Sequence, residues 1–216
     1  LKPSNSIGQL CHFLTMVNLN LRPGAYLVCC LETNRMRKQR NLSMFPAPWG
    51  WLYHFLDYMM IRVLPPVKMS RWLSRALKAG PWRALSYYEM VGRLTHCGFD
   101  VVADEKIDGL HYIAARKASA PPSETVEQYG LLMKLPRVGK DGRLIRVYKF
   151  RTMVPFSEYA QEYIYRRNHL DRGGKFRHDR RVTRFGSILR RYWIDELPML
   201  WNLLKGEVKL VGVRPV

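Results

Sequence analysis

Two adjacent carboxylates, Asp195 and Glu196, are the residues of this chain best suited to chemistry. They lie in the segment SILRRYWIDELPMLWNLLKG, which begins at Ser187 and ends at Gly206. Because proline disfavours a helical conformation in the residue before it, the helical pattern of residues 187–193 is predicted to break near Leu197. Pro198 suits the first turn of a new helix that stops at Gly206. Both carboxylates are therefore expected near a helix N-terminus, where an ionised carboxylate is stabilised and suits a nucleophile or a metal ligand.

Cations precede these carboxylates in unusual number. Eight lysines and arginines lie between Arg172 and Arg191. Arginine binds phosphate through a planar, bidentate fork, so the cluster fits a nucleoside diphosphate or a lipid phosphate. The same charges are also consistent with a solvated surface, with a helical pair between Arg191 and Asp195, or with a site for nucleic acid. His169 and His178 lack metal-ligand spacing and are expected at the surface.

A further pair of cations follows a predicted hairpin. The segment LLMKLPRVGKDGRLIRVYKFRTM is typical of two strands joined by a tight turn at residues 140–142. On the second strand, alternate side chains from Ile145 to Met153 share a face, and Lys149 and Arg151 lie on it. These two charges either point into a site or belong to a solvated strand end, and this strand alone favours neither alternative.

Charge and composition limit the class of protein. The 216 residues include 36 Lys and Arg against 17 Asp and Glu, a net charge of +19 with a pI of about 10.1. Such a field attracts phosphate in a nucleotide, a nucleic acid or an anionic membrane. The four cysteines show no C-x-x-C spacing, so we expect reduced, buried thiols rather than a disulfide or zinc framework. We also expect the sequence to be a fragment cut at both ends.

The first half of the chain has the pattern of an α/β segment. Strands are predicted at residues 25–31, 99–105 and 110–117, the last two joined by a turn at Asp108 and Gly109. Residues 49–64, WGWLYHFLDYMMIRVL, are too interrupted by charge to span a membrane. We favour a buried amphipathic helix there, with a helix in the membrane interface as the alternative. A basic, helix-like span follows, to about Leu94.

A small, polar and proline-containing linker separates this half from the second. Residues 118–125, ASAPPSET, are predicted to mark the boundary between a domain at residues 1–118 and a domain at residues 119–216. In the second domain, Phe156 to Arg167 follow helical spacing with Ser157 as the N-cap, and the aromatic stripe of that helix is expected to pack in the core.

The first domain weakly resembles the C-terminal half of a class I methyltransferase domain. The resemblance covers about Asn18 to Lys117 and depends on L-R-P-G before a strand and on G-F-D-V-V followed by Y-I-A-A-R-K. The glycine-rich motif by which that family holds S-adenosylmethionine is absent. The resemblance implies a partial Rossmann-like α/β architecture only, with no active-site residue.

The second domain closely resembles the bacterial sugar transferase family, the monotopic phosphoglycosyl transferases that start glycan assembly on polyprenyl phosphate. Three segments carry the family's motifs in order: RVGKDGRLIRVYKFRTM, HDRRVTRFGSILRRYWIDELPMLWNLLKG and LVGVRP. The resemblance implies a small α+β catalytic domain with a β-hairpin and helices. It also implies a place at the cytoplasmic face of the bacterial inner membrane, peripheral or monotopic.

The resemblance further implies a two-step transfer of a sugar 1-phosphate from a UDP-sugar to polyprenyl (undecaprenyl) phosphate. Asp195 would be the nucleophile, and Glu196 its neighbour that binds Mg²⁺ or orients the site. The substrate and phosphate ligands that the motifs imply are Lys149, Arg151, Asp179, Arg181, Thr183, Arg190, Arg214 and Pro215.

This sequence departs from the family at several points. The linker and the methyltransferase-like segment stand where the family has a re-entrant membrane helix. Val213 replaces the usual proline, and Arg180 stands where D-P-R is usual. Two other functions stay open: a basic module that binds nucleic acid, and a catalytically inactive module at an anionic membrane surface. For the transferase itself, no nucleic-acid partner is expected.

Overall fold

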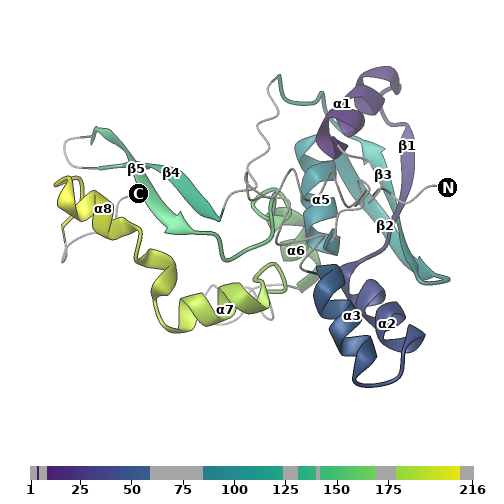
Figure 1. The fold of residues 1–216 in the computed structure, drawn as a ribbon. Helices are drawn as coiled ribbons and strands as arrows, with labels where there is room; N and C mark the ends of the chain where they lie inside the picture. The colour runs from purple at the N-terminus through teal and green to yellow at the C-terminus, as the bar shows by residue number, and fades with distance from the viewer. Residues whose placement is uncertain are drawn as a thin grey trace. The chain divides into compact units, whose positions relative to one another are not determined.

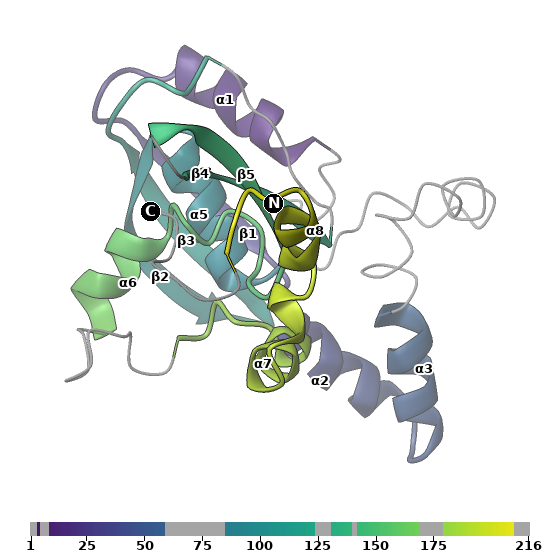
Figure 2. The same ribbon diagram turned by 90° about the vertical axis from the view of Figure 1, so that its left-hand side faces the viewer.

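A computed structural model describes residue 4 and residues 9–58, 85–123, 131–139, 142–168 and 179–209. The chain divides into two compact units. Unit 1 contains Leu1–Glu127 and Phe156–Arg177, and unit 2 contains Gln128–Pro155 and His178–Val216. Figures 1 and 2 show the elements of each unit.

Unit 1 is built on a three-stranded antiparallel sheet in the order β1-β3-β2. The strands are β1 (Tyr26–Leu31), β2 (Phe99–Ile107) and β3 (Leu110–Lys117), close to the predicted bounds. Asp108 and Gly109 both have positive φ, as a two-residue hairpin turn requires, so the predicted turn is confirmed. Every second residue of β3 from His111 to Ala115 is buried, because alternate side chains of a strand face the core.

The described residues of unit 1 form five helices: α1 (Leu10–Asn20), α2 (Asn34–Met44), α3 (Trp49–Tyr58), α5 (Tyr87–His96) and α6 (Gln161–Asn168). Ser86 begins α5 by accepting a hydrogen bond from the backbone N–H of Glu89, as expected of an S-x-x-E capping sequence. Helix α1 was not predicted from the sequence. The core of unit 1 combines side chains of α1, α5, the sheet and the segment of α6, including Leu14, Met90, Phe99, Ile113 and Ile164.

The prediction for residues 49–64 is half wrong. A helix forms at Trp49–Tyr58, but its large apolar side chains are exposed rather than buried. The reason is that its small and charged positions, Gly50 and Asp57, are the ones that face α2. Residues 59–64 lie outside the described residues. In the part of the chain that the structure covers, no helix is long and apolar enough to cross a membrane.

Helix α6 begins later than predicted. Phe156 has a φ of 60°, and residues 155–160 form turns before the helix starts at Gln161, so Ser157 is not its N-cap. The prediction of a core-facing stripe is confirmed for Phe156, Ala160 and Ile164, which are buried, but not for Tyr159, which is 41% exposed. Three of the four cysteines (Cys11, Cys30 and Cys97) are buried, Cys29 is half-buried, and all four are free thiols as expected.

The described residues of unit 2 form both strands of the predicted hairpin and three short helical elements. Residues 140 and 141 of the predicted turn lie outside the described residues. Strand β4 (Leu132–Val138) pairs antiparallel with β5 (Leu144–Phe150), and the helices are α7 (Arg184–Arg191), the 3₁₀ turn η5 (Ile194–Glu196) and α8 (Met199–Leu204). The described residues combine helices with two small antiparallel sheets, so the prediction of a mixed α/β class is confirmed. The Rossmann-like architecture and the two-domain boundary at the linker remain predictions.

Candidate active site

The Asp195–Glu196 pair lies in the short turn between two helices of unit 2. Helix α7 ends at Arg191, the pair occupies η5, and α8 begins at Met199 after Pro198. The predicted restart after Pro198 and the stop at Gly206, which has a φ of 71°, are confirmed. The predicted position of the break is wrong: the helix ends before Trp193, and Leu197 keeps a helical backbone with φ −52° and ψ −37°. Trp193 enters the 3₁₀ turn with a φ of 56°, a strained conformation for a bulky side chain. The chain therefore turns at Trp193, two residues before Asp195.

Thr183 fixes the start of α7. Its hydroxyl accepts a hydrogen bond from the backbone N–H of Gly186 at 2.9 Å and donates to the Thr152 carbonyl at 3.2 Å. The backbone N–H of Thr183 also donates to the Thr152 carbonyl, at 2.9 Å. A Cβ on Gly186 would lie only 2.0 Å from the Thr152 oxygen. Helix α7 is thus held directly on the backbone that follows β5.

Lys149 contacts the carboxylate pair. Its ammonium group donates to Oε1 of Glu196 at 2.7 Å, and each side chain is about one-third exposed. Val147, two residues earlier on the same face of β5, is buried. The strand therefore leaves the core between these residues and directs Lys149 at the turn, which excludes a merely solvated strand end for this residue. Arg151 follows the strand, and its backbone N–H donates to the Leu131 carbonyl at 2.7 Å.

Asp179 and Arg181 form a second charged group in unit 2. The guanidinium of Arg181 holds both oxygens of Asp179, at 2.8 and 2.7 Å, and Arg181 is buried. Burial raises the pKa of the Asp179 carboxyl, but the hydrogen bonds and charge of Arg181, together with the nearby charge of Arg190, outweigh burial and leave that pKa below its usual range. Arg190 itself donates from Nε to the Thr152 hydroxyl at 2.9 Å. Asp179 is therefore an ionised partner that orients an arginine.

The two carboxylates of the turn differ in their surroundings. Glu196 is paired with Lys149, whereas Asp195 makes no hydrogen bond or ion pair with any residue that the structure describes. Arg191 instead lies 5.9 Å from the ring of Tyr192, so the alternative of a helical pair between Arg191 and Asp195 is not observed. A half-buried carboxylate with no partner among the described residues is available to a substrate.

Sequence reasoning missed two residues that position the turn. Asn202 of α8 is fully buried, and its side chain accepts from the backbone N–H of Tyr148 at 3.0 Å and donates to the Arg146 carbonyl at 2.8 Å. These bonds attach α8 to β5, beside which it lies in Figure 1. Thr152 was missed as well. The only sequence signals were an Asn inside an apolar helix and a Thr within K-F-R-T-M. Arg214 and Pro215 lie outside the described residues.

An apolar surface accompanies the charged groups. Large apolar side chains of α7, η5, α8 and their connections are more than two-fifths exposed, although several of them are spaced as one helical face. These side chains are Phe185, Ile188, Tyr192, Trp193, Leu197, Leu200, Trp201 and Leu204. Unit 2 therefore places apolar surface and a carboxylate pair on the same short segment of the chain.

The carboxylates fit a magnesium ion of the kind that binds with a phosphorylated substrate. Among the described residues, no group of three or more His, Cys, Asp or Glu side chains is placed to hold a metal. Mg²⁺ commonly uses only one or two carboxylates and completes its coordination with water and substrate phosphates. The carboxylate of Asp195, which no described residue contacts, and the second oxygen of Glu196 would provide such donors.

Comparison with known proteins identifies the region that contains this site. Residues 124–216 match the family model described as bacterial sugar transferase, which confirms the resemblance for this part of the chain. The resemblance of the first domain to a methyltransferase remains a prediction.

Individual relatives agree with this match. The UDP-galactose-lipid carrier transferase of Erwinia amylovora is 45% identical over 85 residues, and the undecaprenyl-phosphate galactose phosphotransferase of Salmonella typhimurium is 39% identical over 85 residues. Each alignment covers 37% of this chain and 18% of the relative. The exopolysaccharide production protein ExoY of Rhizobium meliloti is 38% identical over 85 residues, 37% of this chain and 38% of that protein. The chain thus matches less than two-fifths of the length of these relatives.

Proposed function

We propose that this chain is a phosphoglycosyl transferase that moves a sugar 1-phosphate from a UDP-sugar to polyprenyl phosphate. The observation that carries the proposal lies within the region matched to sugar transferases: Asp195 has no partner in the described part of the chain, and it adjoins a Glu196 that Lys149 holds. The product of such a transfer begins the assembly of an exopolysaccharide, an O-antigen or another glycan. The names of the relatives support both a UDP-sugar donor and an undecaprenyl phosphate acceptor.

In the first step, a carboxylate oxygen of Asp195 attacks the β-phosphorus of the UDP-sugar. The bond from that phosphorus to the bridging oxygen breaks, UMP leaves with the bridging oxygen, and an aspartyl phosphosugar ester remains. In the second step, a phosphate oxygen of the polyprenyl phosphate attacks the same phosphorus and releases the Asp195 carboxylate. Covalent catalysis divides one difficult transfer into two easier ones. An ionised carboxylate needs no separate base for this attack.

The cations of unit 2 would bind the diphosphate. Lys149 and Arg190 are fixed by Glu196 and Thr152 respectively, so their positive charge is positioned before the substrate arrives. Arg151, Arg181 and Arg214 complete the proposed set of phosphate-binding cations, and Asp179, Thr183 and Pro215 position them. Bound Mg²⁺ would neutralise charge on the diphosphate, with Glu196 as a ligand. Under this proposal, Glu196→Gln lowers UMP release, and a higher Mg²⁺ concentration restores part of it.

We place the reaction at the cytoplasmic face of the bacterial inner membrane, because the acceptor is a lipid. The exposed apolar side chains of α7 and α8, which include Leu200 and Trp201, support contact with lipid close to the carboxylates.

For unit 1 we retain a methyltransferase-like architecture as a proposal. Strands β1 and β2 both run antiparallel to β3, so they are parallel to one another, and α5 directly precedes β2. A strand, a helix and a second strand in the same direction are the repeating unit of Rossmann-like sheets, which supports the proposal.

The test is an assay for UMP. Full-length protein is incubated in detergent with several UDP-sugars, undecaprenyl phosphate and Mg²⁺. We expect UMP release with at least one donor and a lipid-linked sugar diphosphate as the product. Release of UDP instead of UMP would contradict the mechanism, because it places bond breakage at the sugar carbon. Binding of nucleic acid that is independent of Asp195, without UMP release, would favour the nucleic-acid alternative.

A further inference from the structure

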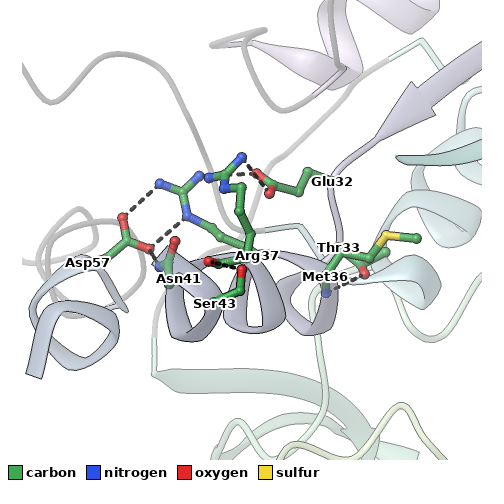
Figure 3. A network of polar contacts seen from close by, with 8 residues as sticks. Glu32, Thr33, Met36, Arg37, Asn41, Ser43 and Asp57 are labelled. Atoms are coloured by element: carbon green, nitrogen blue, oxygen red, sulfur yellow. Dashed lines mark hydrogen bonds and ion pairs between the residues drawn. The ribbon is translucent and has the colours of Figure 1, made fainter. Parts of the chain in front are cut away.

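Helices α2 and α3 of unit 1 form a pair that is fixed by polar contacts. The guanidinium of Arg37 on α2 binds both oxygens of Asp57 on α3, each at 2.7 Å, and Asn41 donates to the same carboxylate at 2.9 Å. Arg37 and Arg40 also pair with the buried Glu32 at the end of β1, at 3.6 and 2.7 Å. Figure 3 shows Arg37 reaching from α2 toward Glu32 on one side and Asp57 on the other.

The polarity of α3 is inverted relative to an ordinary surface helix. Gly50 and Asp57, which are seven residues apart and so on one face, lie against α2 and its following loop. The large apolar side chains of residues 44–56 are instead exposed, although Trp51 also contacts Lys38 of α2. We call them the aromatic face: Met44, Phe45, Trp49, Trp51, Leu52, Tyr53, Phe55 and Leu56, each 43–65% exposed. A soluble surface helix would place its apolar side toward the protein and its charged residue toward water.

Cations border the aromatic face. Helix α2 carries Arg35, Arg37, Lys38 and Arg40 and no acidic residue. The ammonium group of Lys38 lies 4.4 Å from the ring centroid of Trp51, so a positive charge adjoins the aromatic surface itself. Arg35 is exposed one helical turn before Lys38, and within the described ranges its side chain forms no ion pair.

We infer that the aromatic face, together with Arg35 and Lys38 of α2, is a membrane-binding surface of unit 1, with an anionic lipid bilayer as its partner. Tryptophan and tyrosine favour the boundary between headgroups and acyl chains, and lysine and arginine beside them bind anionic headgroups. A short helix with one apolar side lies in the plane of that boundary. The charge of the surface complements an anionic lipid, whereas an exclusively apolar partner would leave Lys38 unpaired. This inference deepens the proposed function and depends on it only for the identity of the membrane.

Vesicle binding tests this inference without donor, acceptor or catalysis. We expect the full chain to sediment with phosphatidylcholine vesicles that contain phosphatidylglycerol, and much less with phosphatidylcholine alone. Trp51→Ser combined with Phe55→Ser should weaken the partition coefficient about tenfold or more, because two large apolar side chains no longer enter the lipid. The matched control is Phe13→Ser combined with Met16→Ser, which replaces apolar side chains of similar exposure on α1 and should leave binding unchanged.

A second measurement locates the contact within the chain. Amide hydrogen exchange in residues 45–58 should slow when anionic vesicles are added, and exchange in α1 should not. Arg35→Gln combined with Lys38→Gln should reduce both binding and its dependence on salt. Equal binding by both double serine variants, or no slowing in residues 45–58, would overturn the inference. So would light scattering that shows a lipid-free dimer dissociated by the Trp51 and Phe55 changes, because a second copy would then occupy the face.

These outcomes are distinct from failure of the proposed function. The Trp51 and Phe55 variant should still release UMP in detergent, since both residues belong to unit 1 and not to the proposed site. Loss of vesicle binding with retained UMP release supports the inference. Vesicle binding with no UMP release by the unaltered chain would instead contradict the proposed function and leave the membrane-binding surface established.

Discussion

At the scale of single residues, the main result is the asymmetry between two neighbouring carboxylates. Glu196 is held by Lys149, a residue 47 positions earlier, while Asp195 has no partner among the described residues. The sequence places both acids in a turn before a helix, and the structure agrees. The sequence could not predict that Lys149 pairs with Glu196. This contact depends on how the end of β5 meets the turn, and no local sequence pattern encodes it.

This asymmetry predicts the effect of Asp195→Asn. The substitution keeps the shape of the side chain and breaks no contact of the described residues, so the free energy of unfolding should change by no more than about 0.5 kcal/mol. The nucleophile is removed, so UMP release should fall below detection while UDP-sugar binding persists. Asp100→Asn is the control, since Asp100 is a partly exposed residue of unit 1 and should retain full activity. Normal UMP release by Asp195→Asn would show that the covalent mechanism is wrong.

At the scale of elements, the site depends on a close approach between α7 and the chain after β5. The glycine at position 186 is essential to it, because the Thr152 carbonyl occupies the place of a Cβ. Hydrogen bonds from the Thr183 backbone and from Arg190 reach the same threonine. The sequence predicts a helix here but gives no reason for Gly186, because the packing partner lies more than 30 residues earlier.

Gly186→Ala should therefore separate α7 from Thr152. A methyl group 2.0 Å from a carbonyl oxygen cannot be accommodated without a shift of the helix. We expect a loss of about 2 kcal/mol in the free energy of unfolding and a lower rate of UMP release, since the carboxylate turn follows α7 directly. Ser187→Ala on the exposed side of the same helix is the control and should change neither quantity appreciably. Unfolding by urea and the UMP assay measure the two effects, and a Gly186→Ala variant as stable and active as the control would contradict the close packing.

A second prediction at this scale concerns how α6 is held in unit 1. Asp104 on β2 accepts from Arg167 and Tyr163 of α6, at 2.7 and 3.2 Å, and pairs with His111 of β3 at 2.7 Å. Burial raises the pKa of the Asp104 carboxyl, but the hydrogen bond to His111 and the charge of Arg167 outweigh it and lower the pKa overall. The carboxylate is thus more stable in the folded chain than in the unfolded one.

The lowered pKa fixes the sign of the pH dependence. A depressed folded-state pKa stabilises the fold above the unfolded value of about 3.9, and this contribution is lost as pH falls through the folded-state pKa. Asp104→Asn should cost about 2 kcal/mol at neutral pH, and the difference from the unaltered chain should shrink below about pH 4. Urea unfolding at several pH values measures it. A difference that grows on acidification would contradict the assignment.

At the scale of the whole molecule, the compact units do not follow the order of the sequence. The linker at residues 118–125 is a clear change of composition, and the family match begins close to it, at residue 124. Yet residues 156–177, within the matched region, belong to unit 1. The sequence predicts that Phe156, Ala160 and Ile164 face a core, but helical spacing does not say which core. Their partners are contributed by α1, α5 and the sheet of unit 1.

The packing of α6 predicts how the matched region behaves by itself. In a fragment of residues 119–216, Phe156, Ala160 and Ile164 would lose the core that now buries them. Burial of a large apolar side chain is worth about 1.5–3 kcal/mol, so we expect this fragment to aggregate or to expose apolar surface to a dye such as ANS, unlike the full chain. Phe156→Ser with Ile164→Ser in the fragment should restore solubility, whereas in the full chain the same pair should lower the free energy of unfolding. A soluble, cooperatively folded fragment without these changes would show that the matched region needs no core from unit 1.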